Sequence, residues 1–229
     1  MSPLSLSGPV GEQPADFVQL LDALSSRAQP AVIFYGSDDS RVELSGRVLA
    51  NWAVKLVGLF SEEYELSPGD LVVVNAAPHW KAAAVILAAG AMGADVTLKP
   101  GGEVDLVVTD RPGAWIDSPQ LGGAELAALS GGMLDASFEE ATGESIPAWV
   151  LDISADVRQQ PDQLLTPLSP VALPETGPGA SGTLVINGWN QDAAAQLVST
   201  WARHEVVVIF QGEPSGRRWD QMRRNEGLD

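Results

Sequence analysis

The sequence contains no cysteine and has few residues of several other chemically useful kinds. Without cysteine, a disulfide-stapled fold, a zinc ribbon and thiol catalysis are all excluded. The two histidines, His79 and His204, lie far apart in the sequence, so we expect no metal site. None of the three lysines, Lys55, Lys81 and Lys99, follows a glycine, which rules out the phosphate loop Gly-x-x-x-x-Gly-Lys.

Positive charge and long apolar runs are also scarce. Lysine and arginine number 13 against 30 acidic residues, giving a net charge of −17. So acidic a surface repels nucleic acid and anionic lipid, and we expect neither as a partner. The longest strongly apolar stretch without a charge, residues 82–94, is shorter than the roughly 20 residues of a membrane span. The start of the chain lacks the pattern of a secretory signal, so the sequence predicts a soluble cytoplasmic protein.

What the chain does have is the length and composition of a folded protein. It has 229 residues, 45% of them hydrophobic, enough for a sizeable core in one large domain or two small ones. The first half alternates between helical and strand patterns. The predicted helices cover residues 14–28, a stretch from Ser45 to before Pro68, and 79–93; the predicted strands cover 31–35, 41–43, 71–75, 95–98 and 104–109.

Strand, helix and strand in this order predict an α/β fold with mainly parallel βαβ sheets. The pattern fades over residues 111–143, where 124–129 favours a helix, and 149–153 favours a strand. A smaller βαβ unit follows a Pro-rich stretch, with strands at 183–186 and 205–210. The predicted divisions are a first lobe (1–155), a Pro-rich connection (156–182), a small βαβ unit of a second lobe (183–212) and a polar tail (213–229).

The polar tail admits two interpretations. It is either a solvated tail or short helix anchored on the body by Trp219 or Met222, or a contact for a second chain through its arginines.

Two strand-to-helix turns are the best candidates for a ligand site. Ligands in open α/β sheets bind at the carboxyl ends of strands. Asn75, His79 and Trp80 occupy such a turn in the first lobe, and a second turn holds Asn187, Trp189 and Asn190. The alternative is that both are ordinary turns, with asparagines capping helices and tryptophans in the core.

One short motif is rejected. Gly177, Gly179 and Gly182 match Gly-x-Gly-x-x-Gly, but they precede a strand and include Pro178. A dinucleotide site needs these glycines after a strand and at the start of a helix, so we interpret the segment as a loop.

Five short segments follow one another along the chain in a characteristic order. They are Arg41–Ser45, the helix with Leu49 and Trp52, residues 67–74 (Ser-Pro-Gly-Asp-Leu-Val-Val-Val), Pro78-His79-Trp80, and residues 89–94 (Ala-Gly-Ala-Met-Gly-Ala). In this order they resemble the N-terminal lobe of adenylate-forming enzymes, the AMP-binding acyl-CoA synthetases. The Leu-Ser, Asn-Trp and His-Trp pairs are more particularly similar to a short actinobacterial family. The resemblance covers residues 31–110 and, more weakly, 183–210.

The departures from that family bear on function. Its members grip ATP phosphates with a Thr/Ser/Gly-rich loop that carries a lysine, whereas residues 166–182 have neither a Ser-Gly-Thr-Thr-Gly run nor a lysine. The sequence also ends before the family's adenine-binding motif, its ribose-binding Asp and the domain with the catalytic Lys. Gly188-Trp189-Asn190 replaces an aromatic-His segment beside the acyl pocket. No catalytic residue and no cofactor can be carried over.

We therefore expect a non-catalytic binding or scaffold protein that resembles adenylate-forming enzymes, with a small-molecule or acyl ligand in the cleft between the lobes. One alternative is an acyl-CoA synthetase-like ligase, or a half-enzyme completed by a partner or acting on another ligand. Another is an unrelated nucleotide-binding α/β domain. A protein partner or homo-oligomer stays open.

Overall fold

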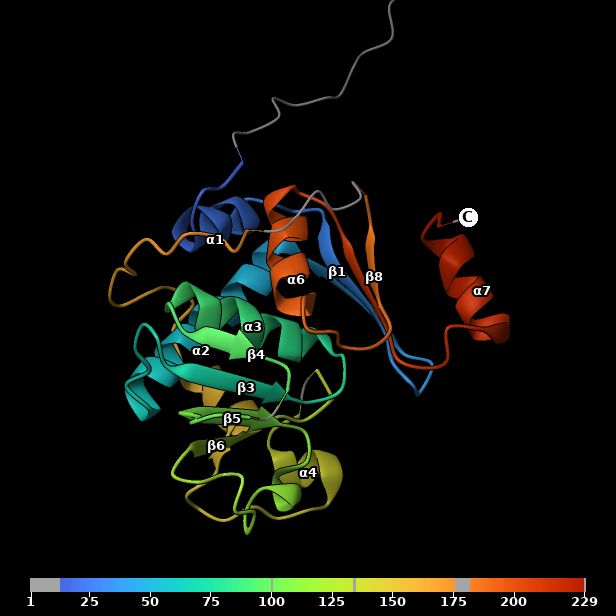
Figure 1. Ribbon diagram of the computed structural model, residues 1–229. Helices are drawn as coiled ribbons and strands as arrows, with labels where there is room; N and C mark the ends of the chain where they lie inside the picture. Colours follow the sequence, from blue (N-terminus) through green and yellow to red (C-terminus); the bar gives the residue numbers. More distant parts are fainter. Residues whose placement is uncertain (1–12, 100, 134, 176–181, 229) are drawn as a thin grey trace, which may run out of the picture.

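Two β-sheets enclose a layer of helices (Figure 1). The computed structural model describes residues 13–99, 101–133, 135–175 and 182–228. The largest apolar cluster fills the space between the sheets, with Phe34 from one sheet and Val74 and Val108 from the other. No helix of these ranges is long and apolar enough to cross a membrane.

The five-stranded sheet is entirely parallel, as the βαβ pattern predicts. Its order is β4-β3-β5-β6-β7. The strands are β3 (Leu71–Asn75), β4 (Asp95–Thr97), β5 (Leu106–Thr109), β6 (Glu125–Ala128) and β7 (Leu151–Asp152). Val72 pairs with Leu106 and Val74 with Val108, so the continuous β-branched run of β3 lies at the centre of the sheet.

The four-stranded sheet has the order β2-β1-β9-β8. Its strands are β1 (Pro30–Tyr35), β2 (Arg41–Ser45), β8 (Leu184–Ile186) and β9 (Val207–Phe210). The predicted hairpin is confirmed, because β1 and β2 are antiparallel, while β1 pairs with β9 and β9 with β8 in parallel. The predicted division into a first lobe (1–155) and a second-lobe unit (183–212) does not follow the sheets, since strands from both ranges share this one. Sequence patterns show which segments are strands, but not which distant segment completes a strand's free edge.

The helices between the sheets are α1 (Phe17–Ser25), α2 (Gly46–Glu63), α3 (Trp80–Ala91) and α6 (Ala193–Ala202). Ser45 caps α2 as predicted, accepting a hydrogen bond from Val48 N. Every residue of α3 is buried, because its Ala-rich surface lets the neighbouring elements approach closely. Gly90 of α3 leaves room for the ring of Phe17 on α1.

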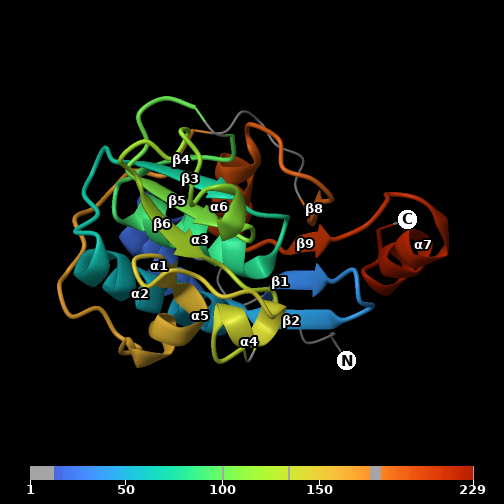
Figure 2. The same cartoon turned by 90° about the horizontal axis from the view of Figure 1, so that it is seen from below.

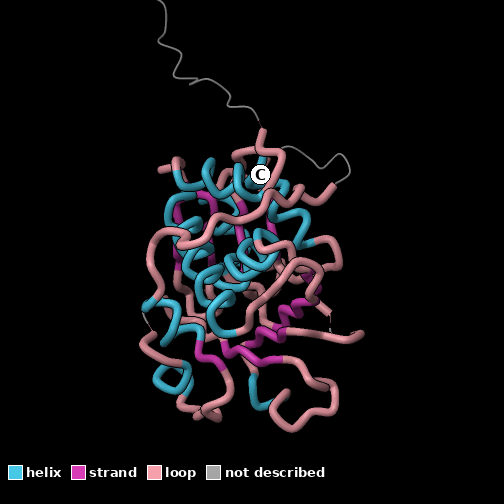
Figure 3. Tube along the Cα trace, turned by 90° about the vertical axis from the view of Figure 1, so that its left-hand side faces the viewer, coloured by secondary structure: helices cyan, strands magenta, loops and turns pink. Residues whose placement is uncertain are grey.

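Loops and short helices cover the outer face of the five-stranded sheet, at the bottom of Figures 1 and 3. They include η1 (Pro112–Ala114) and α4 (Phe138–Thr142), and α5 (Ile153–Asp156) and η2 (Val157–Gln159) follow β7. The helix predicted over 124–129 is wrong, because this segment is strand β6, with Leu126 paired to Val107. Its alanines favour a helix locally, but hydrogen bonding to a buried strand overrides that preference.

The Pro-rich connection lies against α1. Phe17 N donates to Val171 O at 2.9 Å, and Leu173 N donates to Ala15 O at 3.3 Å. Gly177, Pro178 and Gly179 of the rejected motif lie outside the described residues. Residues 1–12, which the prediction of no secretory signal concerns, lie outside them as well.

The polar tail forms a helix, α7 (Gly216–Asn225), set beyond the four-stranded sheet on the side away from the other helices (Figure 2). Met222 is fully buried against Ile33 and Phe210, and Trp219 packs at the edge of this cluster. The short helix lying on the body is confirmed, with Met222 as the buried anchor. The contact for a second chain stays a prediction.

Candidate functional site

The carboxyl edge of the five-stranded sheet is the natural place to look for a site. Strand β4 lies on one side of β3, whereas β5, the next strand in the chain, lies on the other. Ligands of open α/β sheets bind at such a reversal, outside the carboxyl ends of the strands. The segments that follow β3, β5, β6 and β7 all emerge at this edge because the strands are parallel.

At the reversal point itself, hydrogen bonds link the end of β3 to the segment that follows β5. Asn75 Oδ1, at the end of β3, accepts a hydrogen bond from Trp115 Nε1 at 3.1 Å. Thr109 Oγ1 donates to the carbonyl oxygen of Asn75 at 2.8 Å, and Asp110 Oδ2 accepts from Ala77 N at 2.9 Å. The side chain of Asn75 therefore links Trp115, in the layer outside the five-stranded sheet, to β3.

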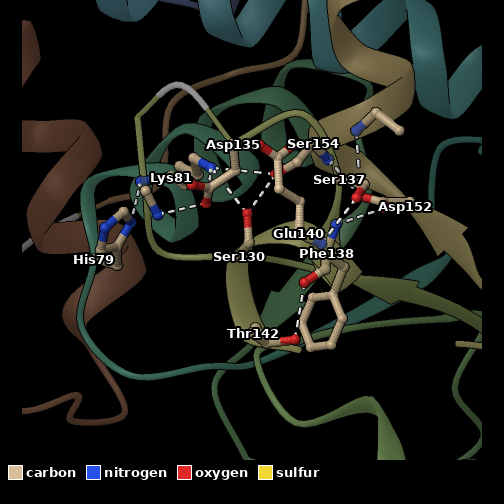
Figure 4. Close-up of polar contacts among 12 residues, drawn as sticks. His79, Lys81, Ser130, Asp135, Ser137, Phe138, Glu140, Thr142, Asp152 and Ser154 are labelled. Carbon is tan, nitrogen blue, oxygen red and sulfur yellow. Dashed lines mark hydrogen bonds and ion pairs between the residues drawn. The ribbon is translucent and has the colours of Figure 1, made fainter. Parts of the chain in front are cut away.

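Further along this edge, a buried lysine lies among hydroxyl groups (Figure 4). Lys81, in the first turn of α3, is 2% exposed. Its Nζ lies 3.4 Å from Ser130 Oγ, just after β6, and 3.2 Å from Ser154 Oγ in α5. The two serine oxygens are 2.6 Å apart, and the nearest carboxylate oxygen, Asp135 Oδ2, is 3.8 Å from Nζ. We call these four residues the Lys81 cluster.

Burial dominates the electrostatics of the Lys81 cluster. It lowers the pKa of Lys81 from 10.5 to about 8, because the charged form loses its hydration. Asp135 and Asp152 act in the opposite direction, whereas Arg158 adds to the lowering. A lysine whose pKa lies this close to neutrality, at the carboxyl edge of a parallel sheet, is typical of functional sites.

His79 lies beside this cluster as the N-cap of α3. Its Nδ1 accepts a hydrogen bond from Lys81 N at 3.1 Å, which assigns the proton of the neutral ring to Nε2. Burial and the charge of Lys81 lower the pKa of His79 to about 4, so the ring is neutral at pH 7. Within the described ranges Nε2 has no hydrogen-bond partner, and the ring packs edge-on against Phe34 at 4.5 Å between centroids.

His79 and Trp80, the other two candidate residues of the turn after β3, face the interior. Trp80 is 1% exposed and packs edge-on against Trp52, with 4.9 Å between ring centroids. His79 is 6% exposed. Both side chains thus belong to the interior in this conformation, and ligand binding by them stays a prediction.

The structure joins the two predicted turns through one residue. Trp189 Nε1 donates to the carbonyl oxygen of Ala76 at 2.8 Å, linking the turn after β8 to the turn after β3. Asn187 donates to the carbonyl oxygens of Phe210 and Gly212, and Asn190 Oδ1 accepts from Asp192 N at 2.8 Å. These asparagines stabilise their own turns, and ligand binding by this second set also stays a prediction.

Sequence reasoning missed the Lys81 cluster. One signal was available, because Lys81 interrupts a helix whose other residues are almost all apolar. A lone cation there must reach the rim of the core or find polar partners inside it. Ser130 and Ser154 carried no comparable signal, since parallel pairing of β6 and β7 brings them together. No group of three or more acidic or histidine side chains in the described ranges is arranged to hold a metal ion.

Comparison with solved structures identifies the fold. An acyl-CoA synthetase from Brucella canis superposes with a TM-score of 0.71 at 15% identity, covering 97% of this chain and 48% of the synthetase. Acetoacetyl-CoA synthetase from Streptomyces lividans gives 0.64 at 13% identity, covering 87% of this chain and 39% of its own. The N-terminal subdomain of NpsA from Klebsiella oxytoca gives 0.57 at 12% identity, covering 93% and 58%. The chain has the fold of the N-terminal lobe of adenylate-forming enzymes.

One curated protein is similar to this chain in sequence. A Mycobacterium tuberculosis protein described as a "TIGR03089 family protein" is 34% identical over 157 residues, which cover 66% of this chain and 58% of that protein. No family model matches the chain. The chain therefore spans about half the length of the enzymes whose fold it shares, and somewhat more of its curated relative.

Proposed function

We propose that this chain is a non-catalytic ligand-binding or scaffold protein with the fold of adenylate-forming enzymes, acting in the cytoplasm. One observation carries the proposal: residues 166–182, which stand where that family holds its phosphate-gripping loop, contain no lysine and no Ser-Gly-Thr-Thr-Gly run. Adenylyl transfer depends on positioned cations that neutralise phosphate charge. This segment has no lysine that could supply such a cation.

The position of the same segment supports the proposal. Val171 accepts a hydrogen bond from Phe17 N at the start of α1, and Leu173 donates to Ala15 just before it. The ring of Phe17 lies against Gly90 near the end of α3. Lys81 stands in the first turn of α3, and nine residues of helix separate it from Gly90 by about 13 Å. Residues 171–173 thus run near the end of α3 that is remote from the carboxyl edge of the five-stranded sheet.

A second candidate is a half-enzyme completed by a partner chain. It is favoured by the coverage of the solved synthetases, of which this chain matches 48% and 39%. The fold similarity, in turn, disfavours an unrelated nucleotide-binding domain.

Calorimetry with ATP and AMP, together with an assay for ATP-dependent pyrophosphate release on a panel of carboxylic acids, tests the proposal. We expect weak or no ATP binding and no pyrophosphate release by the purified chain. Release at an ordinary enzymatic rate, 1 s⁻¹ or faster by order of magnitude, would refute it. Release that requires a second, co-purifying chain would establish the half-enzyme instead.

A further inference from the structure

The ammonium group of Lys81 is buried, and among the described residues no carboxylate oxygen lies closer to it than 3.8 Å. Charge-assisted N–H···O hydrogen bonds are typically about 2.7–2.9 Å long. The contacts of Lys81 Nζ are longer, at 3.2 and 3.4 Å to the serine hydroxyls and 3.8 Å to Asp135. Lys55, by comparison, approaches its carboxylate partner Asp162 to 2.7 Å.

The donors of the Lys81 cluster leave two protons unused. An ammonium group has three N–H donors, and two of those of Lys81 are directed to Ser130 and Ser154. Between the two serines one hydroxyl proton is shared in the 2.6 Å contact, which leaves the other available. Among the described residues, one N–H and one O–H therefore have no oxygen within hydrogen-bond distance, and the nearest further groups to Nζ are Asp135 Oδ2 at 3.8 Å and the rings of Trp52 and Trp80 at 5.8 Å. Two such donors match the two oxygens of a single carboxylate.

A carboxylate already lies next to these donors, but its short hydrogen bond is made within its own loop rather than to Lys81. Asp135 comes from the loop after β6, and its side chain is 17% exposed against 2% for Lys81. Its Oδ2 accepts a hydrogen bond from Gly132 N at 2.6 Å, within its own loop, and stays 3.8 Å from Lys81. Asp152, the other nearby carboxylate, is occupied by backbone N–H groups of Phe138, Ser154 and Ala155.

We propose that Lys81, Ser130 and Ser154 form a binding site for the carboxylate group of a small ligand, and that Asp135 occupies this site as an internal substitute. The inference rests on the proposed function as a binding protein and supplies its ligand class. A ligand enters by displacing the partly exposed side chain of Asp135, and Arg158, which donates to the backbone oxygen of Asp135, adds positive charge at the entrance.

The lysines offer a direct assay. Protein labelled with ¹³C,¹⁵N-lysine has side-chain signals from Lys55, Lys81 and Lys99 alone. Acetate is the probe, and inorganic phosphate is the anion with which its binding is compared. Acetate should shift the Lys81 signal saturably and raise the pKa of Lys81, because a bound anion stabilises the ammonium form. Lys55 and Lys99 are internal controls and should move little.

Variants separate the site from unspecific binding. Asp135→Asn keeps an oxygen for Gly132 N but removes the competing charge, so it should tighten acetate binding at least fivefold. Lys81→Met removes the reporting signal, so acetate binding to this variant is followed by the backbone amide shifts of Ser130 and Ser154, which should no longer move saturably. The matched control Lys55→Met should bind acetate as the parent does. Equal, unsaturable shifts of all three lysines, preference for phosphate over acetate, or unchanged affinity in Asp135→Asn would each overturn the inference.

The two proposals fail separately. Absence of acetate binding, with pyrophosphate release also absent, removes this site and leaves the proposed function standing. Pyrophosphate release removes the proposed function, whatever the lysine signals show.

Discussion

Replacing Lys81 by methionine should stabilise the protein at neutral pH. The side chain is 2% exposed, so folding transfers its charge out of water. Lowering its pKa from 10.5 to about 8 corresponds to roughly 3 kcal/mol of unfavourable free energy in the charged form. Methionine has a similar length and no charge, and Ser130 and Ser154 keep their mutual hydrogen bond in the variant.

Allowing for the lost contacts to the serines and to Asp135, we expect Lys81→Met to be about 1–3 kcal/mol more stable than the parent at pH 7. Urea unfolding at fixed temperature measures the difference. Lys55→Met is the matched control, because Lys55 pairs with an Asp162 side chain that is 71% exposed. We expect that change to alter stability by less than about 1 kcal/mol.

The pH dependence provides the sharper test. Between pH 8 and 10.5 the unfolded state holds a proton on Lys81 that the folded state has lost. The stability of the parent should therefore rise through this window relative to Lys81→Met, shifting the difference between them by roughly 3 kcal/mol in favour of the parent, so that the advantage of the variant disappears. A difference that stays constant from pH 7 to 10.5 would refute the reasoning, since it would mean that Lys81 keeps an ordinary pKa in the folded protein.

Three further substitutions test the packing. Trp189→Phe removes the hydrogen bond to Ala76 and should cost about 0.5–1.5 kcal/mol in urea unfolding, and no loss would show that this link between the turns is unimportant. Met222→Ala should cost about 2–5 kcal/mol and speed hydrogen exchange throughout α7, and unchanged exchange would contradict its role as the anchor. Gly90→Ala should destabilise by about 1–3 kcal/mol despite alanine's higher helix propensity, because the new Cβ would lie 2.6 Å from the Phe17 ring; a gain in thermal stability would argue against this contact.

The sequence by itself determined most of the local structure. The hydrophobic periodicity of α1 and α2, the cap at Ser45 and the β-branched run of β3 each act over a few residues, so a single segment was enough to predict them. The order of those segments also indicated the α/β fold and the adenylate-forming resemblance, which the superpositions bear out at the level of the fold.

Only the tertiary structure decided which segments meet. The free edge of β1 pairs with β9, far along the chain, and the Ala-rich segment of β6 becomes a strand because β5 provides a buried partner. The Lys81 cluster depends on the same effect: parallel pairing of β5, β6 and β7 carries Ser130 and Ser154 to the first turn of α3. Contacts between residues so distant in sequence leave no periodic pattern, because their partners are selected by the packing of whole sheets and helices rather than by neighbouring residues.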